Sequence, residues 1–146
     1  MNREIKFRGM LENGEWVYGG YVKIIDGANC ILSGECHHCE SDGKTKNVLS
    51  FNAVKYKTVG EFTGLKDKNG KGIWEGDRVN LDRLNNEEMH GEVEYSDNLA
   101  AFIVRISGYR SLDPFPLMLV EMGTRSLEVI GSIYENPKLL EGKDND

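Results

Sequence analysis

The residues best equipped for chemistry are three cysteines and two histidines that lie close together in the first third of the chain. They are Cys30, Cys36, His37, His38 and Cys39. Thiolate and imidazole are the ligands of tetrahedral zinc, and two cysteines separated by two residues have the spacing of a metal-binding knuckle. The sequence therefore offers one candidate structural zinc site, with Cys36 and Cys39 as a pair and Cys30 as a third ligand.

This pattern is incomplete for zinc, because no second cysteine pair follows it along the chain. His37 and His38 lie inside the Cys36–Cys39 pair and can hardly turn back onto the same ion, so His90 or a neighbouring subunit would have to supply a fourth ligand. A loop of reduced thiols and a redox-active thiol pair are the alternative interpretations. An odd number of cysteines argues against a disulfide framework, and we expect no cofactor besides this candidate zinc.

A second candidate site is a basic stretch from residue 44 to residue 71. It contains seven lysines against only two acidic residues, Glu61 and Asp67. Four of the lysines stand close to the aromatic residues Phe51 and Phe62, and these are Lys44, Lys46, Lys55 and Lys57. Lysines interleaved with aromatic residues on a strand face are typical of proteins that bind single-stranded nucleic acid. The alternative is an ordinary solvated face, with Phe51, Tyr56 and Phe62 in the core.

Signals for catalysis are weak. The chain has only three histidines and no nucleophile elbow, so no Ser-His-Asp or Cys-His arrangement stands out. The string Gly70-Lys71-Gly72 lacks the Ser or Thr of a phosphate-binding loop, and the segment after Asp67 puts a lysine where a calcium loop needs an oxygen ligand. The carboxylates near Glu92 resemble a solvated strand face. We therefore expect no enzymatic activity.

The sequence predicts that short strands position the candidate cysteines and lysines. Apolar and polar residues alternate in runs broken by glycine-containing turns such as Asn13-Gly14 and Asn69-Gly70, while helical periodicity is nearly absent. About nine such strands predict an all-β fold, a small barrel or sandwich of short antiparallel strands, of which an SH3-like barrel is one form. A short helical turn is expected after Asn136-Pro137.

Length and composition limit the number of domains and the cellular location that we expect. The chain of 146 residues predicts a single domain over residues 1–146, and no apolar run is long enough to span a bilayer. The first residues alternate charged and apolar types instead of forming a signal peptide, so a soluble cytoplasmic protein without membrane contact is expected. A net charge of −6 opposes generic binding to polyanions, which makes a nucleic-acid partner the less favoured expectation.

Four blocks of sequence carry a resemblance to a known family. They are Arg3 to Gly9 followed by Trp16-Val17-Tyr18-Gly19, the central run from Thr58 to Lys71, the corner Ile73-Trp74-Glu75-Gly76-Asp77, and the closing run from Glu128 to Pro137. Together and in this order they resemble the YopX family of phage and prophage proteins. The resemblance implies a small, mainly β protein made in a bacterial host cell, with no established activity, substrate or catalytic residue. The cysteine segment is outside the resemblance.

The glycines of these blocks have an architectural interpretation. Asn69-Gly70 suits a tight turn, and Gly76 before Asp77 suits a backbone corner where a side chain would clash. One further segment, Phe115 to Met122, is too continuously apolar for a strand with one wet face, which predicts burial on both sides or coverage by a second subunit.

Two functions remain open from the sequence. The favoured one is a non-catalytic β module of a phage or prophage that acts by binding a protein partner or by self-assembly into a homo-oligomer. The alternative is a single-stranded nucleic-acid-binding protein that uses the stretch from Lys44 to Lys71.

Overall fold

A computed structural model describes residues 3–25, 27–38, 45–84, 87–106, 115–116 and 126–135, and a few of these by their backbone alone. The chain divides into two compact units, residues 1–61 and 62–146. The single domain expected over residues 1–146 stays a prediction.

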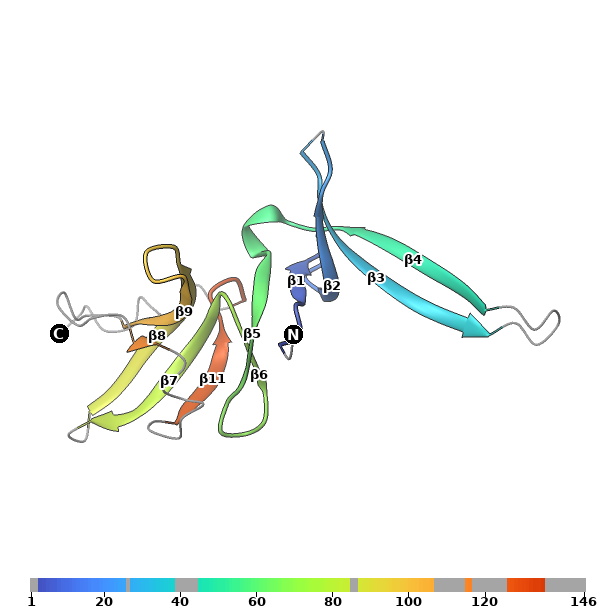
Figure 1. The fold of residues 1–146 in the computed structure, drawn as a ribbon. Helices are drawn as coiled ribbons and strands as arrows, with labels where there is room; N and C mark the ends of the chain where they lie inside the picture. Colours follow the sequence, from blue (N-terminus) through green and yellow to red (C-terminus); the bar gives the residue numbers. More distant parts are fainter. Residues whose placement is uncertain are drawn as a thin grey trace. The chain divides into compact units, whose positions relative to one another are not determined.

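The described residues are mainly β structure, as the alternation predicts, with one 3₁₀ turn and no closed barrel (Figure 1). The elements are β1 (Phe7–Met10), β2 (Trp16–Lys23), β3 (Asn29–His38), β4 (Thr45–Ala53), η1 (Tyr56–Thr58), β5 (Gly60–Lys66), β6 (Gly72–Trp74), β7 (Asp77–Leu84), β8 (Glu87–Ser96), β9 (Ala101–Ile106), β10 (Phe115–Pro116) and β11 (Leu127–Ser132). All pairs of neighbouring strands are antiparallel.

In the first unit the strands lie in the order β4-β3-β2-β1, and the first two residues of β5 pair with β1. The Asn13-Gly14 turn that joins β1 to β2 has Gly14 at φ +89°, a left-handed conformation that glycine adopts without strain. The small interior of this unit contains Met10, Cys30 and Ile31, all less than a tenth exposed. Half of the residues of β2 and most of the described side chains of β4 are exposed.

The second unit holds the larger core. Strands lie in the order β10-β9-β8-β7-β11, and the remainder of β5 pairs with β6. Its buried cluster consists of eight apolar residues, namely Ile73, Val79, Leu81, Met89, Val93, Val104, Leu127 and Val129. Several of these alternate with polar neighbours along β7, β8 and β11, so the two-residue periodicity of the sequence marks the buried face.

The alternating run from Val54 to Phe62 contains the 3₁₀ turn η1 and is therefore not one strand. The interpretation of the cysteine segment as a loop is wrong for its first part, because β3 continues as a strand to His38. The expected helical turn after Pro137 lies outside the described residues, as does the apolar segment from Phe115 to Met122 except its first two residues, which pair with β9. The described residues contain no helix that could cross a membrane.

Candidate binding surface

One exposed apolar surface of the first unit lies on the hairpin formed by β3 and β4. The two strands pair from Cys30 opposite Ala53 to His38 opposite Thr45, whereas β2 pairs with β3 only as far as Leu32. Among the described residues, β3 beyond Leu32 therefore pairs with β4 alone, and Figure 1 shows this hairpin continuing past β2.

Strand alternation divides the hairpin residues between two faces. Leu49 and Phe51 share one face with Leu32, which lies directly opposite Phe51, while Val48 belongs to the other face. The exposed fractions are 49% for Val48, 59% for Leu49 and 61% for Phe51. We call these three side chains the hairpin patch.

This exposure corrects the expectation that Phe51 and Tyr56 are core residues, since Tyr56 is also 64% exposed. Phe62 does pack, because its ring lies 5.0 Å from the ring of Trp74. Alternation in a sequence shows that a strand has two faces, but not whether another element covers either of them.

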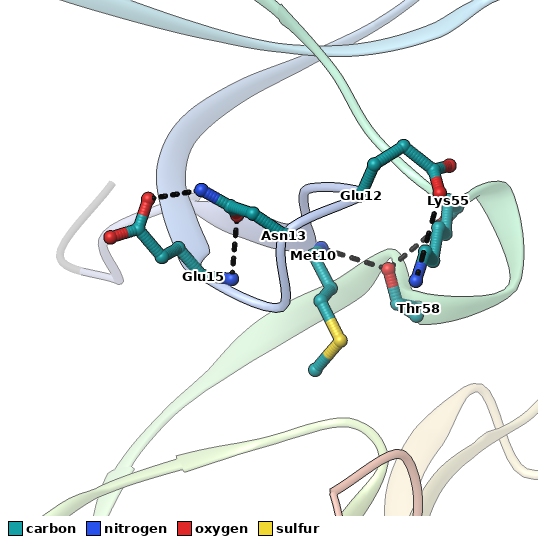
Figure 2. Close-up of polar contacts among 6 residues, drawn as sticks. All are labelled: Met10, Glu12, Asn13, Glu15, Lys55 and Thr58. Carbon is teal, nitrogen blue, oxygen red and sulfur yellow. Dashed lines mark hydrogen bonds and ion pairs between the residues drawn. The ribbon is translucent and has the colours of Figure 1, made fainter.

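The turn after β4 is held firmly against the end of β1 (Figure 2). The Thr58 hydroxyl accepts a hydrogen bond from the Met10 amide at 2.8 Å and donates one to the Lys55 carbonyl at 2.7 Å. The Lys55 amide in turn donates to the Met10 carbonyl at 2.9 Å. Because Thr58 is buried, these bonds fix the backbone of η1 and leave the side chains of residues 55–57 at the surface.

Two of the four lysines predicted to contact nucleic acid lie on this turn. Lys57 has its ammonium 5.8 Å from the centre of the Tyr56 ring, and Lys55 has its ammonium 3.8 Å from the Glu12 carboxylate. Lys46 is placed on β4 by its backbone, and Lys44 lies outside the described residues. The lysines from residue 66 onward belong to the other unit, so the basic stretch is divided between the two units.

The candidate zinc ligands are separated along β3. Cys30 is a buried free cysteine, and Cys36 follows six residues later on the same extended strand, which places their backbones about 20 Å apart. Cys30 and Cys36 of one chain therefore do not reach a single ion. The side chain of Cys36 and all of Cys39 lie outside what the structure describes, so a site built on that pair stays a prediction.

The motif Asp67-Lys68-Asn69-Gly70-Lys71 forms a turn around a buried carboxylate. The Asp67 side chain accepts hydrogen bonds from the amides of Asn69 and Lys71, both at 2.9 Å, and from the amide of Val129 on β11 at 3.0 Å. Burial by itself raises the pKa of Asp67, but these three amides and the Lys71 charge outweigh it and hold the pKa below its ordinary value. The carboxylate thus ties the turn to β11.

The same turn has a second, outer link to β11. The Lys68 ammonium lies 2.7 Å from the Glu128 carboxylate, and the Asn69 side-chain amide donates to the other Glu128 oxygen at 3.3 Å. Polar residues that looked available for ligand contact in the sequence are therefore engaged within the fold. Sequence reasoning missed this role, because Glu128 and Val129 are about sixty residues away along the chain.

Gly76 is a backbone corner, as predicted. Its φ is +84°, its amide donates to the Val93 carbonyl at 2.8 Å, and its carbonyl accepts from the Ile133 amide at 3.0 Å. A Cβ at this position would lie 2.8 Å from Cε2 of Tyr134. This glycine serves geometry, which leaves the hairpin patch and the turn at residues 55–57 as the candidate binding features.

Comparisons with known proteins agree with this architecture. Residues 6–141 match the family described as YopX protein. Among solved structures, the crystal structure of protein EF1440 from Enterococcus faecalis is similar in fold, with a TM-score of 0.55 and 20% sequence identity over 95% of this chain and 99% of that chain. No curated protein matches the chain. Since the family match spans nearly the whole sequence, the chain belongs to the YopX family.

Proposed function

We propose that this protein is a non-catalytic binding module that acts through the β3–β4 hairpin, by contact with a protein partner or with a second copy of itself. The observation that carries the proposal is the hairpin patch, in which Val48, Leu49 and Phe51 are each about half exposed or more within four residues. Single exposed apolar side chains are normal, but Leu49 and Phe51 on one face and Val48 on the other, all on a two-stranded extension, favour a protein contact.

The local chemistry supports the same conclusion. Phe51 and Leu49 offer an aromatic and an aliphatic side chain on one face, the combination that commonly anchors a protein interface. Gly34 lies beside Leu49. A Cβ built on Gly34 would lie 3.1 Å from Cδ2 of Leu49, so the Leu49 side chain already packs against the backbone of Gly34. The setting we propose, a phage- or prophage-encoded protein in the bacterial cytoplasm, follows from the family resemblance and is part of the proposal.

A photo-crosslinking experiment tests this function in bacterial cells that express the full chain. With a photoreactive phenylalanine analogue at position 51, we expect irradiation to yield protein adducts, because a partner would cover that side chain. The matched control has the analogue at Leu99, an exposed apolar residue in the turn between β8 and β9 of the second unit. Equal background labelling at both positions would contradict the proposal, and mass spectrometry identifies each adduct.

A second candidate function is the binding of single-stranded nucleic acid at residues 55–57. The observation that favours it is the exposed Tyr56 ring with Lys57 beside it, since a base can stack on such a ring while lysines contact the phosphates. The four lysines proposed for this site remain Lys44, Lys46, Lys55 and Lys57.

Under this second function, Lys55→Glu/Lys57→Glu is expected to weaken binding to a labelled oligothymidylate at least about tenfold and to flatten its salt dependence. The measurement is fluorescence anisotropy over a series of salt concentrations. Lys6→Glu/Lys23→Glu makes the same change of charge elsewhere in the first unit and should cost less than about threefold. Equal losses for both double variants would leave only a general charge effect and eliminate the site.

A further inference from the structure

We infer that the partner of the hairpin is a second copy of this chain, which adds its own β4 to β4 in antiparallel pairing. This inference rests on the proposed function and names its partner. Within the described residues β4 is the last strand on its side of the sheet, so its outer edge has no strand beside it.

The hydrogen-bond ladder shows which residues form that edge. The Val54 amide donates to the Asn29 carbonyl at 2.9 Å, which makes Asn29 and Val54 a hydrogen-bonded pair. In an antiparallel ladder such pairs alternate, so Asn52, Ser50 and Val48 direct their main-chain groups toward β3. The intervening residues direct theirs outward, and these are Thr45, Asn47, Leu49, Phe51 and Ala53.

The pairing of β3 with β2 gives the same assignment of inward and outward main-chain groups. The Ile24 amide donates to the Ala28 carbonyl at 2.9 Å, so Val22 with Cys30 and Gly20 with Leu32 are the hydrogen-bonded pairs between β2 and β3. Residues of β3 with even numbers therefore bond toward β2 and those with odd numbers toward β4. The outward direction of Leu49 and Phe51 follows from two independent bonds.

This edge lacks the usual protections against strand addition. Natural edge strands are commonly shortened, bulged, interrupted by proline or lined with charges. Strand β4 pairs with β3 over its whole length without a register shift, contains no proline and carries one charged residue, Lys46. Among its described side chains, the large exposed ones are those of the hairpin patch. Such an edge is a template for another extended strand.

The edge is also complementary to itself. The Lys55 amide is already bonded to Met10, so the open edge ends at Ala53 and its midpoint is Leu49. A two-fold axis at Leu49 pairs Asn47 with Phe51 of the partner subunit and Leu49 with Leu49 of the partner subunit. Every outward residue then meets an outward residue, which allows up to about ten main-chain hydrogen bonds.

Charge is compatible with this register. Lys46 would lie opposite Asn52 of the partner subunit, so no lysine on the strand faces another lysine. Apolar contacts gather at the centre, where Leu49 is flanked by Phe51 on the same face. The identical strand therefore satisfies the edge in its hydrogen bonding, its apolar contacts and its charge.

Sedimentation velocity of the purified full chain is the direct test. A contact made by one strand of each subunit, with about ten main-chain hydrogen bonds, is expected to give a dimer with a Kd of about 10 µM. Leu49→Pro removes an outward amide that β3 does not use and should raise the Kd at least about tenfold. Ser50→Lys, the matched control, alters a neighbouring exposed residue outside the hairpin patch whose amide bonds to β3, and should change the Kd less than about threefold. Circular dichroism checks that both variants fold.

A charge-swap pair keeps the test decisive if the proline variant is unfolded. Leu49→Lys and Leu49→Glu each place like charges on the two-fold axis and should be monomeric alone, whereas their mixture should form a heterodimer. A wild-type chain that is monomeric at about 100 µM overturns the inference. If position 51 then crosslinks to other proteins in cells, the proposed function survives without the self-pairing. If it gives no protein adduct, both are lost.

Discussion

Asp67→Ala is expected to destabilise the second unit by about 4 kcal/mol. The substitution leaves the amides of Asn69, Lys71 and Val129 without their acceptor. The Val129 amide is buried, and a buried donor left unpaired costs roughly 1–3 kcal/mol, while the two part-buried amides add about 1 kcal/mol each. The measurement is urea unfolding followed by the fluorescence of Trp74, in a Trp16→Phe background where it is the sole tryptophan.

The control for this prediction is Asp97→Ala in the exposed turn between β8 and β9, which should stay within about 0.5 kcal/mol of the background. Asp67→Asn should lie between the two, because it keeps one acceptor oxygen but turns an NH₂ group toward an amide donor. An Asp67→Ala variant as stable as Asp97→Ala would show that the turn does not depend on this carboxylate.

Asp67 also predicts a dependence of stability on pH. Because the folded state holds its pKa below the ordinary value of 3.8, the unfolded chain takes up the proton first as the pH falls. The stabilisation is therefore complete above about pH 5 and is lost as the pH falls through 3.8 toward the lower folded pKa. The difference in unfolding free energy between the background and Asp67→Ala should shrink over that range. A constant difference down to pH 3 would contradict it.

Gly76→Val is expected to cost the second unit about 3 kcal/mol. Valine is strained at a φ of +84°, and its Cβ would meet the Tyr134 ring at 2.8 Å. The backbone cannot easily shift away, because the amide and carbonyl of Gly76 bond to Val93 and Ile133. Thermal unfolding by circular dichroism measures the effect.

Gly70→Val separates the two causes. Gly70 has nearly the same φ, +81°, but nothing lies within 4 Å of a Cβ built there. Its valine variant should lose only about 1 kcal/mol, the cost of the left-handed backbone. A Gly76→Val protein that melts with the wild type would show that the corner tolerates a side chain and that Tyr134 does not restrict it.

The turns and many of the strands could be predicted from the sequence. Asn13-Gly14 and Asn69-Gly70 were predicted as turns, and both glycines adopt the positive φ that such turns require. The alternation predicted short strands, and apolar residues of β7, β8, β9 and β11 form most of the core of the second unit. These predictions succeeded because turn conformation and two-residue periodicity depend on near neighbours in the chain.

The candidate site was harder to predict from the sequence. Phe51 and Tyr56 were interpreted as core because aromatic residues are usually buried, and the cysteine segment was interpreted as a loop. The structure places Phe51 on a hairpin with its side chain 61% exposed and continues β3 to His38. No local signal distinguishes a covered strand face from an open one.

The sequence by itself determined that this protein is built of short antiparallel strands and that Gly14, Gly70 and Gly76 lie at turns or at a backbone corner. Tertiary structure alone decided that Asp67 binds the amide of Val129, that Gly76 faces Tyr134, and that β4 is the last described strand on its side of the sheet. The physical reason is separation along the chain: strand periodicity and turn geometry are set by adjacent residues, whereas burial, pairing and the free edges of a sheet depend on segments that meet only after folding.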